Sequence, residues 1–192
     1  MCVDINTIGE KDKRLLLTLA RNAIEWFAKY GEKYSPSEFE LSDMMYEKSG
    51  VFVSLFRAGK LRGCIGYTEP IKEIWNAVID NSINASFYDP RFPPLKESEL
   101  SSLSIEISIL SDIKKLDYTD SSDLLSKINR RMGLLIRKGM HSATYLPEVW
   151  EQFEDKDDLL ESLCLKASLH VDAWRTGHID MGYYYTNTFK NN

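Results

Sequence analysis

The sequence predicts an α+β fold in which a mainly antiparallel sheet packs with about three main helices, with room for a smaller second lobe. Two observations predict it. Apolar residues recur at helical spacing in some stretches and at every second position in others, and short hairpin connections join the predicted strands. A two-residue hairpin joins antiparallel strands, because a parallel pair needs a long crossover. The 192 residues, 43% of them hydrophobic, can bury a core without a disulfide or a metal, so we expect one domain over residues 1–192.

Helices are predicted where apolar side chains recur every three or four residues, in residues 15–30, 71–88 and 157–169. Thr7 and Glu10 have the spacing of a capping box ahead of the first helix. Gly31 can end that helix, since glycine readily adopts the left-handed conformation. Pro90 ends the second helix, because the residue before a proline avoids the helical region.

Strands are predicted where side chains alternate with a period of two, in residues 51–56, 61–67, 103–110, 132–137, 142–146 and 179–189. Residues 57–60 form the turn of the first hairpin, with Gly59 available for a positive φ. The strand over residues 51–56 is largely apolar on both faces, so we expect it to be central in the sheet and covered on both sides.

The composition excludes several classes of protein. A formal charge of -5 disfavours general binding to nucleic acid, which needs clustered Lys and Arg, but leaves room for a local basic pocket. The three cysteines are widely spaced and odd in number, which favours a reducing compartment over a disulfide framework. The start of the sequence has no apolar segment typical of a secretory signal, and no run of about 18 apolar residues predicts a membrane span. We therefore expect a cytoplasmic protein with no membrane partner.

The segment most indicative of chemistry covers residues 61–67. In an extended strand Arg62, Cys64 and Gly66 point to one face and Gly63 to the other. A guanidinium on the same side as a thiol favours the thiolate, and Gly66 leaves space beside the sulfur for a ligand. One hypothesis is therefore a reactive Cys64 with Arg62 holding an anion. The alternative is that Cys64 is a small buried side chain and that the glycines permit tight packing or a bulge.

Three further polar residues could belong to the same site. Asp89 and Arg91 lie on a loop stiffened by prolines, which can fix a polar group at a binding site. The alternative is that the two residues pair with each other, or that Asp89 caps the preceding turn. Glu106 lies on the polar face of its strand and is a candidate general base if that face also carries Cys64. We thus name Cys64 and Glu106 as candidate catalytic residues, and the substrate-binding candidates are Arg62, Gly63, Gly66, Asp89 and Arg91.

No motif predicts a cofactor or a metal. Residues 63–66 lack the glycine spacing of a dinucleotide loop, and neither a P-loop nor a nucleophile elbow occurs. The cysteines and histidines do not have the spacing of metal ligands. A dyad of Cys64 with His141 has no local support in the sequence.

Five blocks of sequence carry a resemblance: LRGCIG at 61–66, DPRFPPL at 89–95, IEIS at 105–108, ATYLP at 143–147 and LCLKA at 163–167. In this order they are similar to the blocks of the AMMECR-type domain family. The resemblance covers about residues 10–189. It implies an α+β fold with a larger sheet-and-helix part and a smaller lobe, and a functional groove near residues 61–66.

The resemblance names no reaction, because the biochemical role of this family is unsettled. In prokaryotes such domains are often associated with a Memo-like protein and a radical S-adenosylmethionine enzyme, which makes these two the expected partners. This chain lacks the cysteine cluster of that enzyme, so any iron–sulfur chemistry would belong to the partner.

Two functions fit these residues. The first is an enzyme or enzyme subunit with a small anionic substrate held at Arg62 and Cys64. The alternative is a non-catalytic binding or adaptor module that uses the same groove for a protein or nucleic-acid partner. Binding of RNA by a local basic pocket is the weaker form of this alternative, since the total charge is negative.

Overall fold

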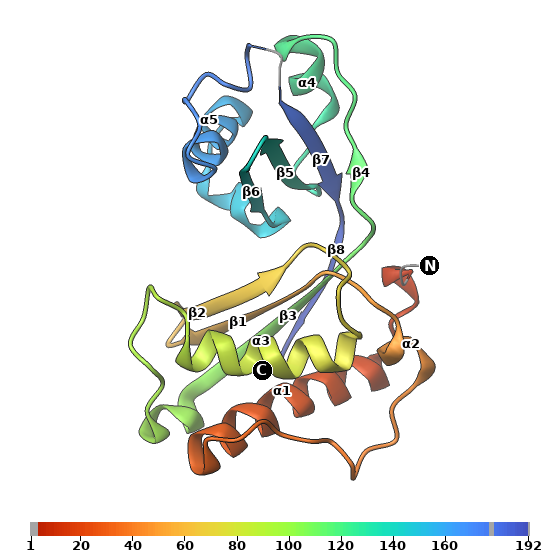
Figure 1. The fold of residues 1–192 in the computed structure, drawn as a ribbon, viewed down its shortest axis with the longest axis vertical. Coiled ribbons are helices and arrows are strands. Elements are labelled where there is room, and N and C mark those ends of the chain that lie inside the picture. The colour runs from red at the N-terminus through yellow and green to blue at the C-terminus, as the bar shows by residue number, and fades with distance from the viewer. Residues whose placement is uncertain (1–3, 177–178, 192) are drawn as a thin grey trace. The chain divides into compact units, whose positions relative to one another are not determined.

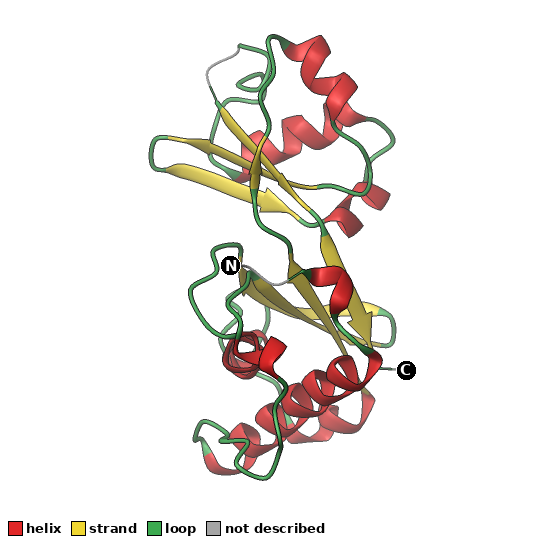
Figure 2. Cartoon of the chain, turned by 90° about the vertical axis from the view of Figure 1, so that its right-hand side faces the viewer, coloured by secondary structure: helices red, strands yellow, loops and turns green. Residues whose placement is uncertain are grey.

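The computed structural model describes residues 4–176 and 179–191. The chain divides into two compact units, one formed by Met1–Ser111 with Asn187–Asn192 and the other by Asp112–Thr186. Each unit has a four-stranded sheet of its own, and the strand pairs with an assigned register are antiparallel. Figure 2 shows the two sheets in yellow, each with its own helices in red. The predicted α+β class is therefore confirmed, with the difference that the strands form two sheets.

The first unit has the sheet order β2-β1-β3-β8. Its strands are β1 Val51–Arg57, β2 Lys60–Tyr67, β3 Leu103–Leu110 and β8 Thr186–Lys190. Its helices are α1 Glu10–Tyr30, α2 Asp43–Tyr46 and α3 Ile74–Phe87, with short 3-10 turns η1 Ile5–Thr7 and η2 Glu97–Ser102. The long helices α1 and α3 lie on the same face of this sheet (Figure 1). Strand β1 is central, as its apolar sequence predicts, and β2 forms an edge.

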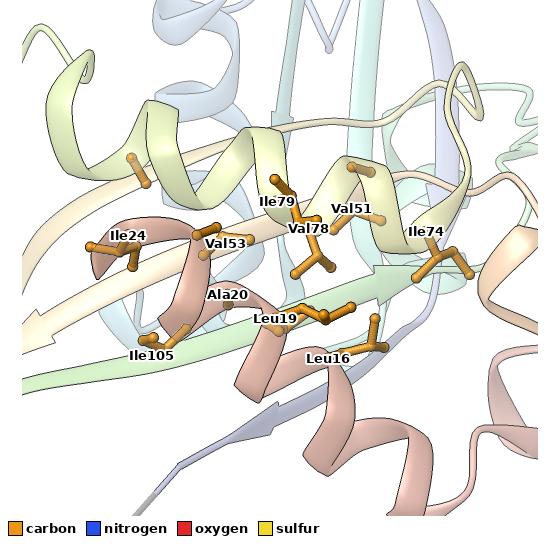
Figure 3. Close-up of a cluster of buried hydrophobic side chains, with 14 of the residues drawn as sticks. Leu16, Leu19, Ala20, Ile24, Val51, Val53, Ile74, Val78, Ile79 and Ile105 are labelled. Carbon is orange, nitrogen blue, oxygen red and sulfur yellow. The ribbon is translucent and has the colours of Figure 1, made fainter. Parts of the chain in front are cut away.

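The core of this unit lies between that face and the two helices. Alternate residues of β1 and β3 are fully buried there, namely Val51, Val53, Leu55, Ile105, Ile107 and Ile109. Figure 3 shows several of them against Leu16, Leu19 and Ile24 of α1 and against Ile74, Val78 and Ile79 of α3. Each fully buried aliphatic side chain contributes roughly 1.5–3 kcal/mol to stability. This strip fixes the face of each strand, so the residues between these positions point away from the helices.

The ends of α1 differ in how well the sequence predicts them. Gly31 ends the helix with a φ of 70°, as expected for a left-handed cap. The predicted capping box is wrong, because α1 begins at Glu10 after Gly9 and Thr7 instead donates to the carbonyl of Asp4 at 2.7 Å. The Glu10 carboxylate pairs with Lys13 one turn later. Residues 4–7 form their own short turn, which removes Thr7 from the helix start.

The second unit has the sheet order β4-β7-β5-β6. Its strands are β4 Lys114–Lys115, β5 Gly133–Lys138, β6 His141–Tyr145 and β7 Asp180–Tyr184, and its helices are α4 Ser121–Lys127, η3 Pro147–Gln152 and α5 Lys156–Lys166. Cys164 is fully buried in its core together with Trp174, so this thiol serves packing. Burial also raises the pKa of the Cys164 thiol.

The segment predicted as one last strand is divided in the structure. Strand β7 belongs to the sheet of the second unit, whereas β8 belongs to the sheet of the first. The boundary between the units falls between Thr186 and Asn187. A period of two continues through such a change of sheet, because it reports extended backbone and not the partner strand.

Candidate functional site

Cys64 lies on the edge strand β2, directly opposite Ser54 of β1. Its side chain is half-buried, and the hydroxyl of Ser54 donates a hydrogen bond to its sulfur over 3.1 Å between Oγ and Sγ. Ser54 itself is only 8% exposed. The neighbouring position Val53 is fully buried in the core, so Cys64 and Ser54 occupy the face of the sheet away from α1 and α3.

A row of polar side chains crosses this face. Ser54 stands opposite Cys64 on one side and opposite Glu106 of β3 on the other. Residues directly opposite one another share a face, so the three side chains point the same way. The Cα atoms of Cys64 and Glu106 are two strand spacings apart, roughly 10 Å. Glu106 is half-buried and has interactions of its own.

Strand β8 extends this row. The hydroxyls of Ser108 and Thr188 are 3.0 Å apart, and the amide of Asn191 donates to the carbonyl of Ile105 at 3.2 Å. These two contacts give β8 an antiparallel register on β3, in which Lys190 stands opposite Glu106.

Asp89 and Arg91 hold the backbone of Cys64 from the free edge of β2. The Asp89 carboxylate accepts the Cys64 N–H at 2.8 Å, and the Arg91 guanidinium donates to the Cys64 carbonyl at 2.8 Å. The two side chains also bond each other, with Nε and Nη2 of Arg91 at 2.9 and 2.6 Å from the two Asp89 oxygens. We call Asp89 and Arg91 the clip.

The two members of the clip differ in exposure. Asp89 is 3% exposed, while the side chain of Arg91 is 54% exposed. Hydrogen bonds from the Arg91 side chain, aided by the Cys64 amide and opposed by burial, lower the pKa of Asp89 to about 2. The carboxylate is therefore ionised at neutral pH. The pairing of these two residues was one of the alternatives that the sequence left open, and the contact with Cys64 adds to it.

Arg62 is directed elsewhere. The pairing of β1 with β2 passes from Leu55–Gly63 to Phe56–Leu61, so Arg62 forms a bulge. Its guanidinium bonds both oxygens of Glu99 in η2, at 2.9 and 3.1 Å, and also contacts the carbonyl of Pro94 at 3.4 Å. The Arg62 side chain is 12% exposed, and its Nη1 is buried with no hydrogen-bond partner among the described residues.

Glu99 was not predicted as a site residue. It bonds Arg62 and, at 3.3 Å, Arg57, so two guanidinium groups share one carboxylate. Hydrogen bonds from Arg62 first, and then from the backbone of Lys96, lower the pKa of Glu99 to about 2. Glu99 lies 37 positions from Arg62 in the sequence, and no local pattern connects the two.

Both glycines of the motif have a packing reason. A Cβ on Gly63 would stand 2.1 Å from the carbonyl oxygen of Ala85, so this glycine lets β2 approach the backbone of α3. A Cβ on Gly66 would stand 2.4 Å from ring carbons of Phe52. The ring of Phe52 therefore occupies the space beside Gly66 that the sequence pattern offered to a ligand. The close contacts at both glycines agree with the alternative that these residues permit tight packing.

The structure thus brings Cys64, Asp89 and Arg91 into direct contact and aligns Glu106 with Cys64 through Ser54. Arg62 pairs with Glu99. The sequence missed Ser54 because an unbroken hairpin around residues 57–60 would place it opposite Gly63, and the bulge moves it to Cys64.

Other candidates lie apart from these contacts. His141 is on β6 in the second unit, with Nδ1 3.1 Å from the carbonyl oxygen of Ala167, while Cys2 and His178 are outside the described residues. Within residues 4–176 and 179–191, no group of three His, Cys, Asp or Glu is arranged to hold a metal ion. In the same part of the chain, no helix is long and apolar enough to cross a membrane.

The comparisons with known proteins agree on one family. The AMMECR1 family model matches residues 17–189. The chain is 38% identical to Protein Mbar_A1807 of Methanosarcina barkeri over 174 residues, which cover 88% of this chain and 86% of that protein. It is also 38% identical to Protein MK0488 of Methanopyrus kandleri, with 87% and 84% covered. Among solved structures, the uncharacterized protein PH0010 from Pyrococcus horikoshii matches with a TM-score of 0.90 and 32% identity, covering 96% of this chain and 94% of that one. The chain belongs to the AMMECR1 family.

Proposed function

We propose that the chain is an enzyme, or a subunit of one, whose reacting group is the thiol of Cys64. One observation carries the proposal: the half-buried sulfur of Cys64 accepts a hydrogen bond from Ser54, on the sheet face that also carries Glu106. This hydrogen bond holds the sulfur in one orientation on that face, and a thiol is a side chain that can act as a nucleophile. The buried Cys164 in the second unit is the contrasting case, because its environment favours the neutral thiol.

The chemistry that this arrangement suits is acyl or alkyl transfer. The sulfur would form a bond with an electrophilic carbon, and the leaving group would depart with the electron pair of the broken bond. The thiol proton would pass by way of the Ser54 hydroxyl, which stands between the two side chains, to the carboxylate of Glu106 as the base. A small anionic substrate is supported by Arg57 and Arg62, which share the single carboxylate of Glu99. That cluster leaves one positive charge in excess near β2.

Alkylation by iodoacetamide with mass mapping tests the thiol. We expect Cys64 to react faster in the folded protein than Cys164, and faster than Cys64 in denatured protein. Ser54→Ala should lower the rate of Cys64 alkylation by several-fold to about tenfold, as the loss of one hydrogen bond predicts. Ser108→Ala is the matched control, because Ser108 lies on the same face but bonds Thr188. A folded Cys64 no faster than the denatured one would contradict a reactive thiol.

A second pair of probes tests the preference for an anion. Iodoacetate and iodoacetamide deliver similar groups to sulfur and differ in charge. If the site attracts anions, the ratio of the iodoacetate rate to the iodoacetamide rate should be higher for folded than for denatured Cys64, and added salt should reduce it. An equal ratio in both states would remove the anionic substrate from the proposal and leave the thiol.

A binding or adaptor module is the second candidate, and a specific observation favours it. Arg62 and Asp89, which a substrate site would use, already form ion pairs inside the protein with Glu99 and Arg91. A module of this kind should keep its partner after Cys64→Ser, whereas an enzyme should lose its reaction. A Memo-like protein and a radical S-adenosylmethionine enzyme are the partners to test first, by co-purification with wild-type and Cys64→Ser chains.

A further inference from the structure

The edge of β2 poses a physical problem at Cys64. An edge strand presents N–H and C=O groups that have no neighbouring strand, and such groups invite water or a foreign strand. The N–H and C=O of Cys64 point to this free side, since the atoms that bond them belong to the loop over residues 89–95. The residue that carries the thiol is therefore one whose backbone needs support from outside the sheet.

The clip supplies this support with the same hydrogen bonds that a residue of a neighbouring strand would make. In an antiparallel pair, one residue offers both an acceptor and a donor to the residue opposite. Asp89 and Arg91 together offer the same two groups to Cys64, each at 2.8 Å. Because both partners are charged, these hydrogen bonds are stronger than the amide pairs they replace.

The clip is itself held rigidly. The Asp89 carboxylate accepts the backbone N–H of Arg91 at 3.1 Å, and the Asp89 carbonyl accepts the N–H of Phe92 at 3.1 Å. At the far end of the loop, the N–H of Leu95 donates to Ser86 of α3 at 2.8 Å. The prolines at positions 90, 93 and 94 fix three φ angles between these anchor points. The loop can therefore transmit the position of α3 to the backbone of Cys64.

We infer that Asp89 and Arg91 are positioning residues that hold the Cys64 thiol in place through the Cys64 backbone. This inference rests on the proposed function only for the importance of the thiol, since the contacts with Cys64 stand without it. It changes the role that the sequence suggested for these residues, because Asp89 is 3% exposed and its carboxylate oxygens are already used by Arg91 and Cys64. The sulfur keeps its contact with Ser54 only while the Cys64 backbone stays at this place in the sheet.

The test uses Asp89→Asn in the full chain. An asparagine carbonyl can still accept the Cys64 N–H, but its NH2 group faces the Arg91 guanidinium with a second donor, so the clip opens. We expect amide hydrogen exchange at Cys64 to become roughly tenfold faster or more, and the pH profile of Cys64 alkylation to shift. Asp123→Asn is the matched control, because Asp123 also bonds a basic side chain, Lys127, and a backbone N–H, that of Thr119.

Arg91→Lys provides a second variant that keeps the charge and removes the two-point contact with Asp89. It should produce the same two changes, and it remains informative if Asp89→Asn does not fold. The inference is overturned if the Cys64 amide exchanges as in wild type in the variants that fold, or if the control Asp123→Asn changes it equally. If exchange quickens but alkylation of wild-type Cys64 is no faster than in denatured protein, the clip holds the backbone and it is the proposed reactive thiol that fails.

Discussion

The two hairpins of the molecule are built on the same plan and differ where chemistry is concerned. In each, a short turn joins an inner strand to an edge strand: β1 to β2 in the first unit and β5 to β6 in the second. The β5–β6 register runs unbroken from Leu134–Tyr145 to Lys138–His141. The β1–β2 register shifts by one residue at Arg62. The irregular hairpin carries the half-buried thiol, and its edge strand is the one that the charged clip bonds.

The backbone groups at the free edges of the two hairpins also have different hydrogen-bond partners. On β6 the carbonyl of Thr144 accepts a hydrogen bond from Lys166 of α5 at 2.9 Å. On β2 both backbone groups of Cys64 are bonded by a carboxylate and a guanidinium. The difference teaches that the bulged strand is supported at both backbone groups of one residue, by side chains 25 and 27 positions away in the sequence. Such departures from local rules are where functional sites are expected.

The largest expected difference in stability between the two hairpins comes from replacing a glycine in each by alanine. Gly63→Ala should destabilise the protein by about 3 kcal/mol or more, because the new Cβ would lie 2.1 Å from the backbone oxygen of Ala85 and backbone cannot rotate away. Gly139→Ala in the other hairpin should cost about 1 kcal/mol, since its φ of 60° strains alanine but nothing lies within 4 Å of the added Cβ. Urea unfolding of both variants measures the difference. Equal losses would show that the approach of β2 to α3 is not tight.

Acid should loosen the two hairpins in a defined order. The pKa of Asp89 and that of Glu99 are each lowered to about 2, so the stability they add is present above their ordinary values near 4 and is lost as the pH falls toward 2. In the second hairpin the side-chain hydroxyl of Thr144 donates to the Leu134 carbonyl and bonds the Tyr184 hydroxyl, and burial raises the pKa of Tyr184, so these contacts across β5 and β6 do not titrate in this range.

Hydrogen exchange between pH 4 and pH 2 measures this order. The protection factor of the Cys64 amide should fall before that of the Ala143 amide, which lies opposite Ile136 in the unbroken β5–β6 pairing. Loss of protection at Ala143 first, or at both together, would show that the carboxylates do not hold the first hairpin. In the Glu99→Gln variant, which lacks one of the two carboxylates, the difference between the hairpins should become smaller.

The same contrast explains what the sequence could predict. The three main helices, the turn of the first hairpin and the central place of β1 follow from periodicity and turn chemistry, which act over a few residues. The bulge at Arg62 leaves no mark in the alternation of side chains, and without it Ser54 cannot be placed opposite Cys64. Glu99 is joined to Arg62 only by the folded chain. Local rules thus predict the elements and the motif, while the partners of the motif come from contacts between distant segments.

The turns themselves give the smallest expected effect. In the first hairpin both central residues, Ala58 and Gly59, have positive φ, at 49° and 75°, which is the pattern of a type I′ turn. Alanine is strained there and asparagine much less so, so Ala58→Asn should raise the free energy of unfolding by up to about 1 kcal/mol. In the second hairpin only Gly139 has a positive φ, as in a type II′ turn, so Met140→Asn should change stability by less than about 0.5 kcal/mol although Met140 is 99% exposed. Chemical denaturation measures the free energy of unfolding of both variants. An equal gain in the two turns would mean that asparagine stabilises through the polarity of its side chain. A gain confined to Ala58→Asn would assign the effect to the positive φ of that position in the bulged hairpin.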